Sequence, residues 1–316
     1  MQTASPPALT VDPAAAYPEL GTLRAALGAR DWPTVRDGLM AVEPGSRTTL
    51  LRLAVDGYSD RHFLEGLAEA EPDEPLTAAL LGDLLIRQAW EIRTSKRAQY
   101  VSRAQFDQFH EMLRRAERLL IDATARHPDN PTLWTLRLIT VRGLELGHSE
   151  ARRRYDRLAA SDPHHVPGQR QLLQQLCPKW GGSFEAVHDF ARGAMRAAPE
   201  GAHNGVLVVE AHLEHMAELD GAERRRYWTD GGVHTELREA AQRSVLHPAF
   251  RRTPGWVLVQ NTFAMVFWMI DDHRTAARLL SGLGHLVSAE PWDMLGDPVA
   301  AFEKARRQAY QKAGVR

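Results

Sequence analysis

The chain has 316 residues, of which 44% are hydrophobic and 25% are charged, values close to the average of globular proteins. Its 39 basic and 40 acidic residues leave a net charge of -1, so no overall field favours binding to nucleic acid or to an anionic membrane. The single cysteine, Cys177, excludes an intramolecular disulfide and a metal site made of cysteines alone.

The first 18 residues are rich in Pro, Ala and Thr and contain no basic segment followed by an apolar one. We expect a flexible arm over residues 1–18 and a cytoplasmic protein. The most apolar stretch, 256–270, has 15 residues and a polar centre, which is too short to cross a bilayer of about 30 Å. We expect it to be a buried helix and expect no membrane partner.

Helical periodicity covers most of the chain, prolines stand at regular helix boundaries, and alternating strand patterns are nearly absent. We expect one helical-repeat domain over 19–316, with a looser N-terminal cap at 19–95 and a repeat array at 102–316. Helices are predicted at 19–29, 33–43, 46–57, 61–70, 76–95, 102–127, 131–146, 149–160, 165–176, 184–198, 203–219, 233–247, 255–271, 274–289 and 298–313.

A spacing of small, bulky and small residues followed by proline repeats between residues 116 and 199. The copies are Ala116, Leu120, Ala123 and Pro128; Ala151, Tyr155, Leu158 and Pro163; and Ala186, Phe190, Gly193 and Pro199. This pattern is typical of the second helix of a tetratricopeptide-type hairpin. The predicted fold is therefore all-α: a tetratricopeptide-like superhelix of antiparallel helix hairpins, or α-α solenoid.

The repeat also has departures from its pattern. Trp134 stands where a tetratricopeptide first helix carries its large aromatic residue, but Arg137 and Leu138 replace the leucine and glycine of that pattern. The interval between Pro199 and Pro248 is longer than the others, and glycines near 220–232 predict a loop-rich insertion there.

Residues 178–183, Pro-Lys-Trp-Gly-Gly-Ser, connect two predicted helices. Ser183 is a suitable N-cap, and Gly181 and Gly182 allow a sharp turn beside Trp180. The segment can simply be a tight turn, or its N–H groups can hold a carboxylate or phosphate beside the indole.

The same segment, followed by Phe190-Ala191-Arg192, resembles the signature stretch of a bacterial family named domain of unknown function 4034. The resemblance rests on about 20 residues, and the helix repeats around them agree with it over about 200 residues. It implies a tetratricopeptide-like fold and carries no established activity.

Two histidine pairs are candidates for a metal site. Glu185 and His188 are three residues apart on one predicted helix, and His212 and His215 are three residues apart on the next. A site would require both helices to face one cavity; histidines that are partly buried and hydrogen-bonded are the commoner outcome. We expect no bound cofactor.

Asn261 lies in the apolar 256–270 helix with Gln260 and Thr262 on either side. Buried amides need hydrogen-bond partners. Asn261 can bond neighbouring helices, or it can face a groove and bind a peptide main chain, and the sequence leaves both interpretations open.

No phosphate-binding glycine loop and no Gly-x-Ser-x-Gly motif occurs in the sequence. The leading hypothesis is a cytoplasmic module that binds a peptide or protein on its concave face, lined by Trp134, Trp180, His212 and Asn261. The alternatives are an enzyme or accessory protein of a bacterial biosynthetic pathway with a His/Glu-lined pocket, and self-association through a terminal helix pair.

Overall fold

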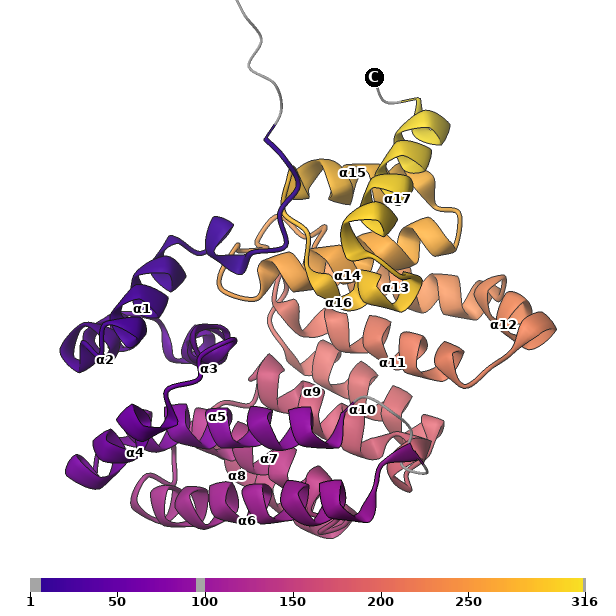
Figure 1. Ribbon diagram of the computed structural model, residues 1–316. Coiled ribbons are helices and arrows are strands. Elements are labelled where there is room, and N and C mark those ends of the chain that lie inside the picture. The colour runs from indigo at the N-terminus through magenta and orange to yellow at the C-terminus, as the bar shows by residue number, and fades with distance from the viewer. Residues whose placement is uncertain (1–6, 95–99, 315–316) are drawn as a thin grey trace, which may run out of the picture. The chain divides into compact units, whose positions relative to one another are not determined.

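The structure is a computed structural model that describes residues 7–94 and 100–314, so residues 1–6 of the expected arm lie outside it. The described residues form helices and no β-strand; a single parallel bridge joins Thr10 and Leu286 (Figure 1). The predicted all-α class is confirmed. The chain divides into two compact units: a first unit of residues 19–187, and a second unit that combines residues up to 18 with 188–316.

The helices of the first unit begin at prolines or capping residues. Pro44, Pro75 and Pro131 each occupy the first turn of a helix, where a missing N–H is tolerated. Ser102 and Gln105 form a capping box. The helices are α1 (Pro18–Gly28), α2 (Trp32–Met40), α3 (Pro44–Val55), α4 (Arg61–Ala70), α5 (Pro75–Arg93), α6 (Arg103–Arg126), α7 (Pro131–Gly143), α8 (His148–Ser161) and α9 (Val166–Leu176), followed by the 3-10 turn Pro178–Trp180.

Successive helices of the first unit pack against each other from α5 to α9, and α7 also contacts both α5 and α9. The small residues of the repeat lie in these contacts, since Ala116 and Ala151 are 0% and 1% exposed. The third copy differs. Phe190 is only partly buried, and Gly193 is exposed with open space where a Cβ would stand. The first small residue is therefore closely packed in the first two copies, whereas the packing of the third copy does not require a small residue at Gly193.

Helix α10 (Phe184–Ala197) runs from the first unit into the second. The second unit continues with α11 (Val206–Ala217), α12 (Gly221–Trp228), α13 (Gly231–Arg243), α14 (Trp256–Met269), α15 (His273–Leu283), α16 (Ala289–Trp292) and α17 (Pro298–Ala313). The apolar helix α14 is its centre, because α11, α15, α16 and α17 all contact it. In the part of the chain that the structure describes, no helix combines the length and the apolar character needed to cross a membrane.

Two expectations require correction. Residues 10–17 do not behave as a flexible arm: Thr10 pairs with Leu286, and the Tyr17 hydroxyl accepts hydrogen bonds from the backbone N–H groups of Gly255 and Val257, at 2.9 and 3.3 Å. These contacts tie the segment to the second unit.

The insertion near 220–232 is not mainly a loop, because Gly221–Trp228 form α12. The glycines that suggested a loop lie at its first residue and beyond its end, whereas Ala, Glu and Arg favour the helix between them. The side chain of Trp228 anchors this helix, since the residue is only 8% exposed.

Candidate functional site

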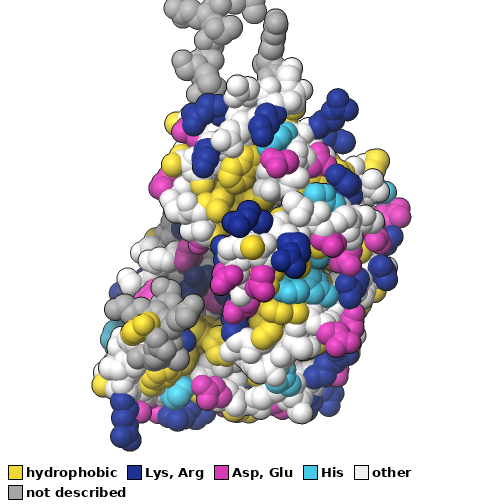
Figure 2. Space-filling model, turned by 90° about the vertical axis from the view of Figure 1, so that its right-hand side faces the viewer, with side chains coloured by type: hydrophobic (Ala, Val, Ile, Leu, Met, Phe, Trp, Pro, Cys, Tyr) yellow, Lys and Arg dark blue, Asp and Glu magenta, His cyan; other side chains and the backbone are white. Residues whose placement is uncertain are grey.

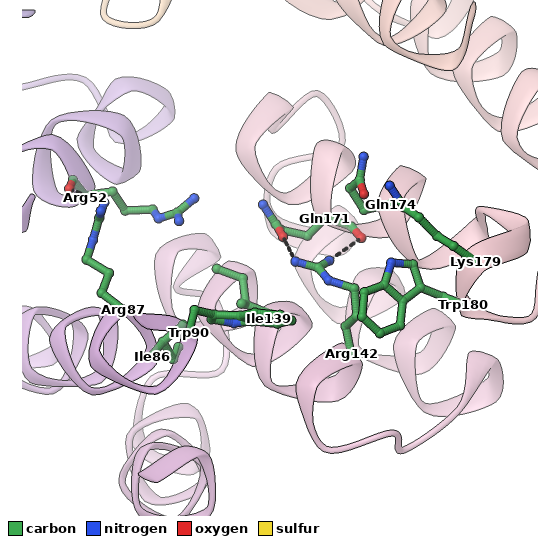
Figure 3. A pocket seen from close by; sticks show the side chains of 10 residues that line it. All are labelled: Arg52, Ile86, Arg87, Trp90, Ile139, Arg142, Gln171, Gln174, Lys179 and Trp180. Atoms are coloured by element: carbon green, nitrogen blue, oxygen red, sulfur yellow. Dashed lines mark hydrogen bonds between the residues drawn. The ribbon is translucent and has the colours of Figure 1, made fainter. Parts of the chain in front are cut away.

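The first unit contains a pocket of about 470 Å³ among the helices α3, α5, α7 and α9 and the turn that follows α9 (Figure 3). Four basic residues, two tryptophans, two glutamines and two isoleucines line it, and no acidic residue is among them. The lining residues are Arg52, Ile86, Arg87, Trp90, Ile139, Arg142, Gln171, Gln174, Lys179 and Trp180.

Trp90 and Trp180 meet edge to face across one end of this pocket, with ring centroids 6.5 Å apart. The guanidinium of Arg142 lies 5.8 Å from each indole and donates to Gln171 Oε1 at 3.0 Å (Figure 3). Cation–π attraction and this hydrogen bond fix the direction of the arginine side chain. Its charge is thus held at the pocket wall in a defined position.

The indole N–H groups of the two tryptophans form no hydrogen bond among the described residues. The Nε1 atoms of Trp90 and Trp180 are buried and have no hydrogen-bond partner within residues 7–94 and 100–314. A buried donor without a partner costs about 1–3 kcal/mol of folding free energy. The pocket therefore combines positive charge with unused donors.

At the other end of the pocket, the positive charges are partly balanced. Asp83, which is fully buried, accepts hydrogen bonds from Arg52 at 3.0 Å and from Arg87 at 2.8 Å. Arg87 also pairs with Asp56 at 2.6 Å. Burial tends to lower the pKa of Arg87, but the carboxylates of Asp83 and Asp56 outweigh it and raise that pKa. Arg87 therefore keeps its charge, and the contacts with Asp83 hold both arginine side chains at the pocket wall.

The turn 178–183 positions Trp180. Gly181 has a φ of 86°, and a Cβ at Gly182 would overlap the carbonyl of Leu176. The N–H groups of both glycines are used within the turn, where they donate to Pro178 and Cys177 carbonyls. These two N–H groups are therefore not directed at a ligand. The N-cap role predicted for Ser183 is confirmed, because its hydroxyl accepts a hydrogen bond from Ala186 N at 3.2 Å. His148 Nε2 donates to the Trp180 carbonyl at 2.9 Å and holds the turn in place.

Two of the predicted lining residues are buried in packing contacts. Trp134 is 6% exposed, and its indole donates to the Pro128 carbonyl at 2.6 Å. Asn261 is 0% exposed; its amide donates to the Val257 carbonyl and its Oδ1 accepts from the Trp292 indole, both at 2.8 Å. Of the two interpretations of Asn261, the structure supports the bond between neighbouring helices. Neither residue lines the pocket.

The second unit brings together a cluster of side chains around His212. The imidazole rings of His188 and His212 have centroids 4.7 Å apart, and His188 Nε2 and His215 Nδ1 share a hydrogen bond at 3.1 Å. His212 lies 2.6 Å from the Tyr227 hydroxyl through Nδ1 and 3.2 Å from Glu236 Oε2 through Nε2. His188 of the first predicted pair therefore lies beside both members of the second pair, His212 and His215. Figure 2 shows a face of the molecule on which histidines are exposed beside acidic and basic side chains.

Burial makes these imidazoles weak bases. Loss of solvation, followed by the nearby His215 and Arg192, lowers the pKa of His188 to about 4. Burial and then His188 and His215 lower the pKa of His212 to about 3. Burial also raises the pKa of Tyr227, so the phenol keeps its proton. At neutral pH the cluster holds neutral imidazoles beside one carboxylate.

The acidic member of the cluster is not the one that the sequence suggested. Glu185 is exposed at the start of α10, whereas Glu236 of α13 lies beside His212. Arg192 on α10 also reaches Glu236, with Nη1 donating to Oε1 at 3.0 Å. Local spacing could not have indicated Glu236, because it is 24 residues from His212 and the helix between them was not predicted.

No family model matches the chain, and no curated protein matches it.

Proposed function

We propose that the first unit binds an extended peptide segment of a protein partner, with a carboxylate of that peptide held in the pocket beside Trp90, Arg142 and Trp180. The observation that carries the proposal is the pocket wall itself: four basic side chains, two buried indole N–H groups without partners in the described residues, and no acidic lining residue. Arginine and lysine bind carboxylates through charge-assisted hydrogen bonds.

The arrangement of helices supports a tetratricopeptide-like array as the scaffold of this site. If α5 and α6 form one hairpin and α7 and α8 the next, the pocket is lined by the first helix of each, together with α3 and α9. Contacts of α7 with both α5 and α9 fit this stacking. In such arrays the first helices form the concave surface that receives a partner. A cytoplasmic location is part of the same proposal.

The size and polarity of the pocket suit one or two peptide residues better than a whole folded partner. Its volume of about 470 Å³ lies within the roughly 300–1,000 Å³ of small-ligand sites. Gln171 and Gln174 offer amide groups to a peptide main chain, and Ile86 and Ile139 offer apolar contact. We therefore expect selectivity for an acidic side chain or a free C-terminal carboxylate.

Tryptophan fluorescence tests the proposal. A randomised peptide library with free C-termini is first screened for binding to the full chain. The peptides that bind are resynthesised as C-terminal amides and with Asp or Glu changed to Asn or Gln. Each peptide is then titrated into the protein while tryptophan fluorescence is recorded. We expect removal of one carboxylate to weaken binding by about tenfold or more, which corresponds to ~1.4 kcal/mol.

Variants locate the site. Lys179→Glu reverses a charge at the pocket wall, and Trp180→Phe removes an indole N–H while keeping an aromatic ring; both should weaken binding. Arg118→Glu is the control, because Arg118 is a 65% exposed basic residue on α6 outside the pocket. The proposal fails if no library peptide binds, or if Arg118→Glu weakens binding as much as Lys179→Glu does.

A further inference from the structure

Three potential metal ligands come together from three helices of the second unit. One atom each from His188 of α10, His212 of α11 and Glu236 of α13 lie within 4.8 Å of one another. We propose that these three residues bind one divalent transition-metal ion, with Zn²⁺ as the best fit. This site is separate from the pocket of the first unit and does not depend on the function proposed for that pocket.

The donor atoms decide the class of metal. Two imidazole nitrogens and one carboxylate oxygen suit Zn²⁺ and its neighbours in the first transition row, whereas Mg²⁺ and Ca²⁺ prefer oxygen ligands alone. Tetrahedral ligand bonds of about 2.1 Å place donors about 3.4 Å apart. The 3.2 Å between His212 Nε2 and Glu236 Oε2 already matches this spacing. The widest spacing must shorten by no more than about 1.4 Å, which side-chain rotation supplies.

The residues that contact the three proposed ligands match the outer hydrogen-bond partners that orient ligands in metal sites. Arg192 donates to Oε1 of Glu236 and leaves Oε2 directed at His212. Tyr227 bonds Nδ1 of His212 and leaves Nε2 on the side of Glu236. Such outer contacts fix the orientation of ligating histidines and carboxylates. The cluster is thus oriented before an ion binds.

The proton on His212 must change position when the ion binds. Without a metal, the carboxylate of Glu236 only accepts, so Nε2 of His212 carries the proton and Nδ1 accepts from the Tyr227 hydroxyl. In the other neutral tautomer, Nδ1–H donates to the Tyr227 oxygen and Nε2 presents its lone pair.

Three ligands would leave a coordination position open, as catalytic zinc sites do. The Glu236 side chain is 33% exposed and His188 is partly exposed, so this position borders solvent. His215 bonds His188 and can orient it from outside the ligand set.

The test uses the full chain after dialysis against a chelator. Zn²⁺ is titrated by calorimetry at pH 7, and Co²⁺ is added separately because its visible absorption reports the coordination geometry. We expect one ion per chain and a tetrahedral Co²⁺ spectrum. Zn²⁺ should also raise the unfolding temperature, because an ion that binds only the folded state stabilises it.

Variants separate ligands from their neighbours. His212→Ala should abolish binding, and Glu236→Gln should do the same with less risk to folding, because the Glu236 side chain is 33% exposed and Gln has nearly the same shape. Tyr227→Phe should weaken binding about 10- to 100-fold by removing an outer contact. His247→Gln is the matched control: it lies in the same unit, outside the cluster, where it pairs with Glu200. Absence of stoichiometric binding by the wild type, or undiminished binding by folded Glu236→Gln, overturns the proposal.

Discussion

Glu117 on α6 and Arg154 on α8 form an ion pair with a closest distance of 2.8 Å although they are only 7% and 2% exposed. Arg137 on α7 donates to the same carboxylate at 2.8 Å. The carboxylate of Glu117 thus bonds two buried arginines and connects three consecutive helices, while Glu150 supplies a second carboxylate to Arg154 at 2.6 Å.

Replacing that carboxylate should destabilise the first unit. Glu117→Gln removes the carboxylate that pairs with the buried guanidinium groups of Arg137 and Arg154. Breaking a buried ion pair costs about 3–5 kcal/mol. Urea unfolding measures the loss. Glu111→Gln is the control on the same helix, because its side chain is 66% exposed and its nearest arginine is 3.6 Å away; a loss of less than about 1 kcal/mol is expected there. Equal losses in both variants would contradict the role assigned to Glu117.

The histidine cluster should make the metal-free protein less stable in acid. Unfolded histidine has a pKa near 6.5, whereas the pKa values of His188 and His212 in the folded chain are about 4 and about 3. As the pH falls from 6.5 towards 4, the unfolded chain takes up protons that the folded chain does not, so stability decreases. Each such proton contributes at most about 1.4 kcal/mol per pH unit.

His212→Gln removes one of these two imidazoles, each of which binds a proton more weakly in the folded chain than in the unfolded chain. The variant should lose stability less steeply than the wild type between pH 6.5 and 4, while the two curves run parallel between pH 7 and 8. Urea unfolding at a series of pH values, in the presence of a chelator, measures both slopes. Parallel curves over the whole range would show that His212 is not the protected group.

Asn261 should matter for stability and not for peptide binding. Asn261→Ala removes the acceptor of the Trp292 indole inside the core, which should cost about 1–3 kcal/mol. Gln308→Ala removes a comparable acceptor from Trp268 at a half-buried position and should cost less. Thermal unfolding ranks the two variants. If Asn261→Ala weakens peptide binding while stability is unchanged, the result would contradict this prediction and would support a role of Asn261 in binding a peptide main chain.

Two glycine substitutions should have opposite signs. A methyl group at Gly182 meets the Leu176 carbonyl, so Gly182→Ala should displace the turn that carries Trp180 and lower both stability and peptide affinity. Gly193 lies within a helix and nothing stands within 4 Å of an added Cβ, so Gly193→Ala should stabilise by up to about 1 kcal/mol. Differential scanning calorimetry distinguishes the signs; a neutral Gly182→Ala variant would contradict the packing described for the turn.

The sequence predicted the helices well because their signals are local. Prolines in the first turn and polar caps mark where α3, α5, α7 and α17 begin, and the predicted first residues of these helices agree within two residues. It missed α12 because the flanking glycines obscured a run of ordinary helix formers. The resemblance to the family of unknown function and the solenoid arrangement stay predictions.

The sites were harder to predict because each depends on contacts between distant helices. Trp180 was recognised from its turn, but its partners Trp90 and Arg142 carry no local signal of a shared pocket. Arg137 was interpreted as a departure from the repeat, whereas its partner Glu117 is 20 residues away on the preceding helix. Only the packing of helices brings these groups together.

The Tyr17 hydroxyl bonded to Gly255 and Val257 has a consequence for biosynthesis. Residues 19–187 leave the ribosome as one uninterrupted block and can fold while translation continues. The segment before them must wait for more than 230 further residues before its docking site exists. The second unit is consequently completed last. A chain that ended after residue 187 would contain the first unit, but Tyr17 would lack the N–H groups of Gly255 and Val257 to which it bonds.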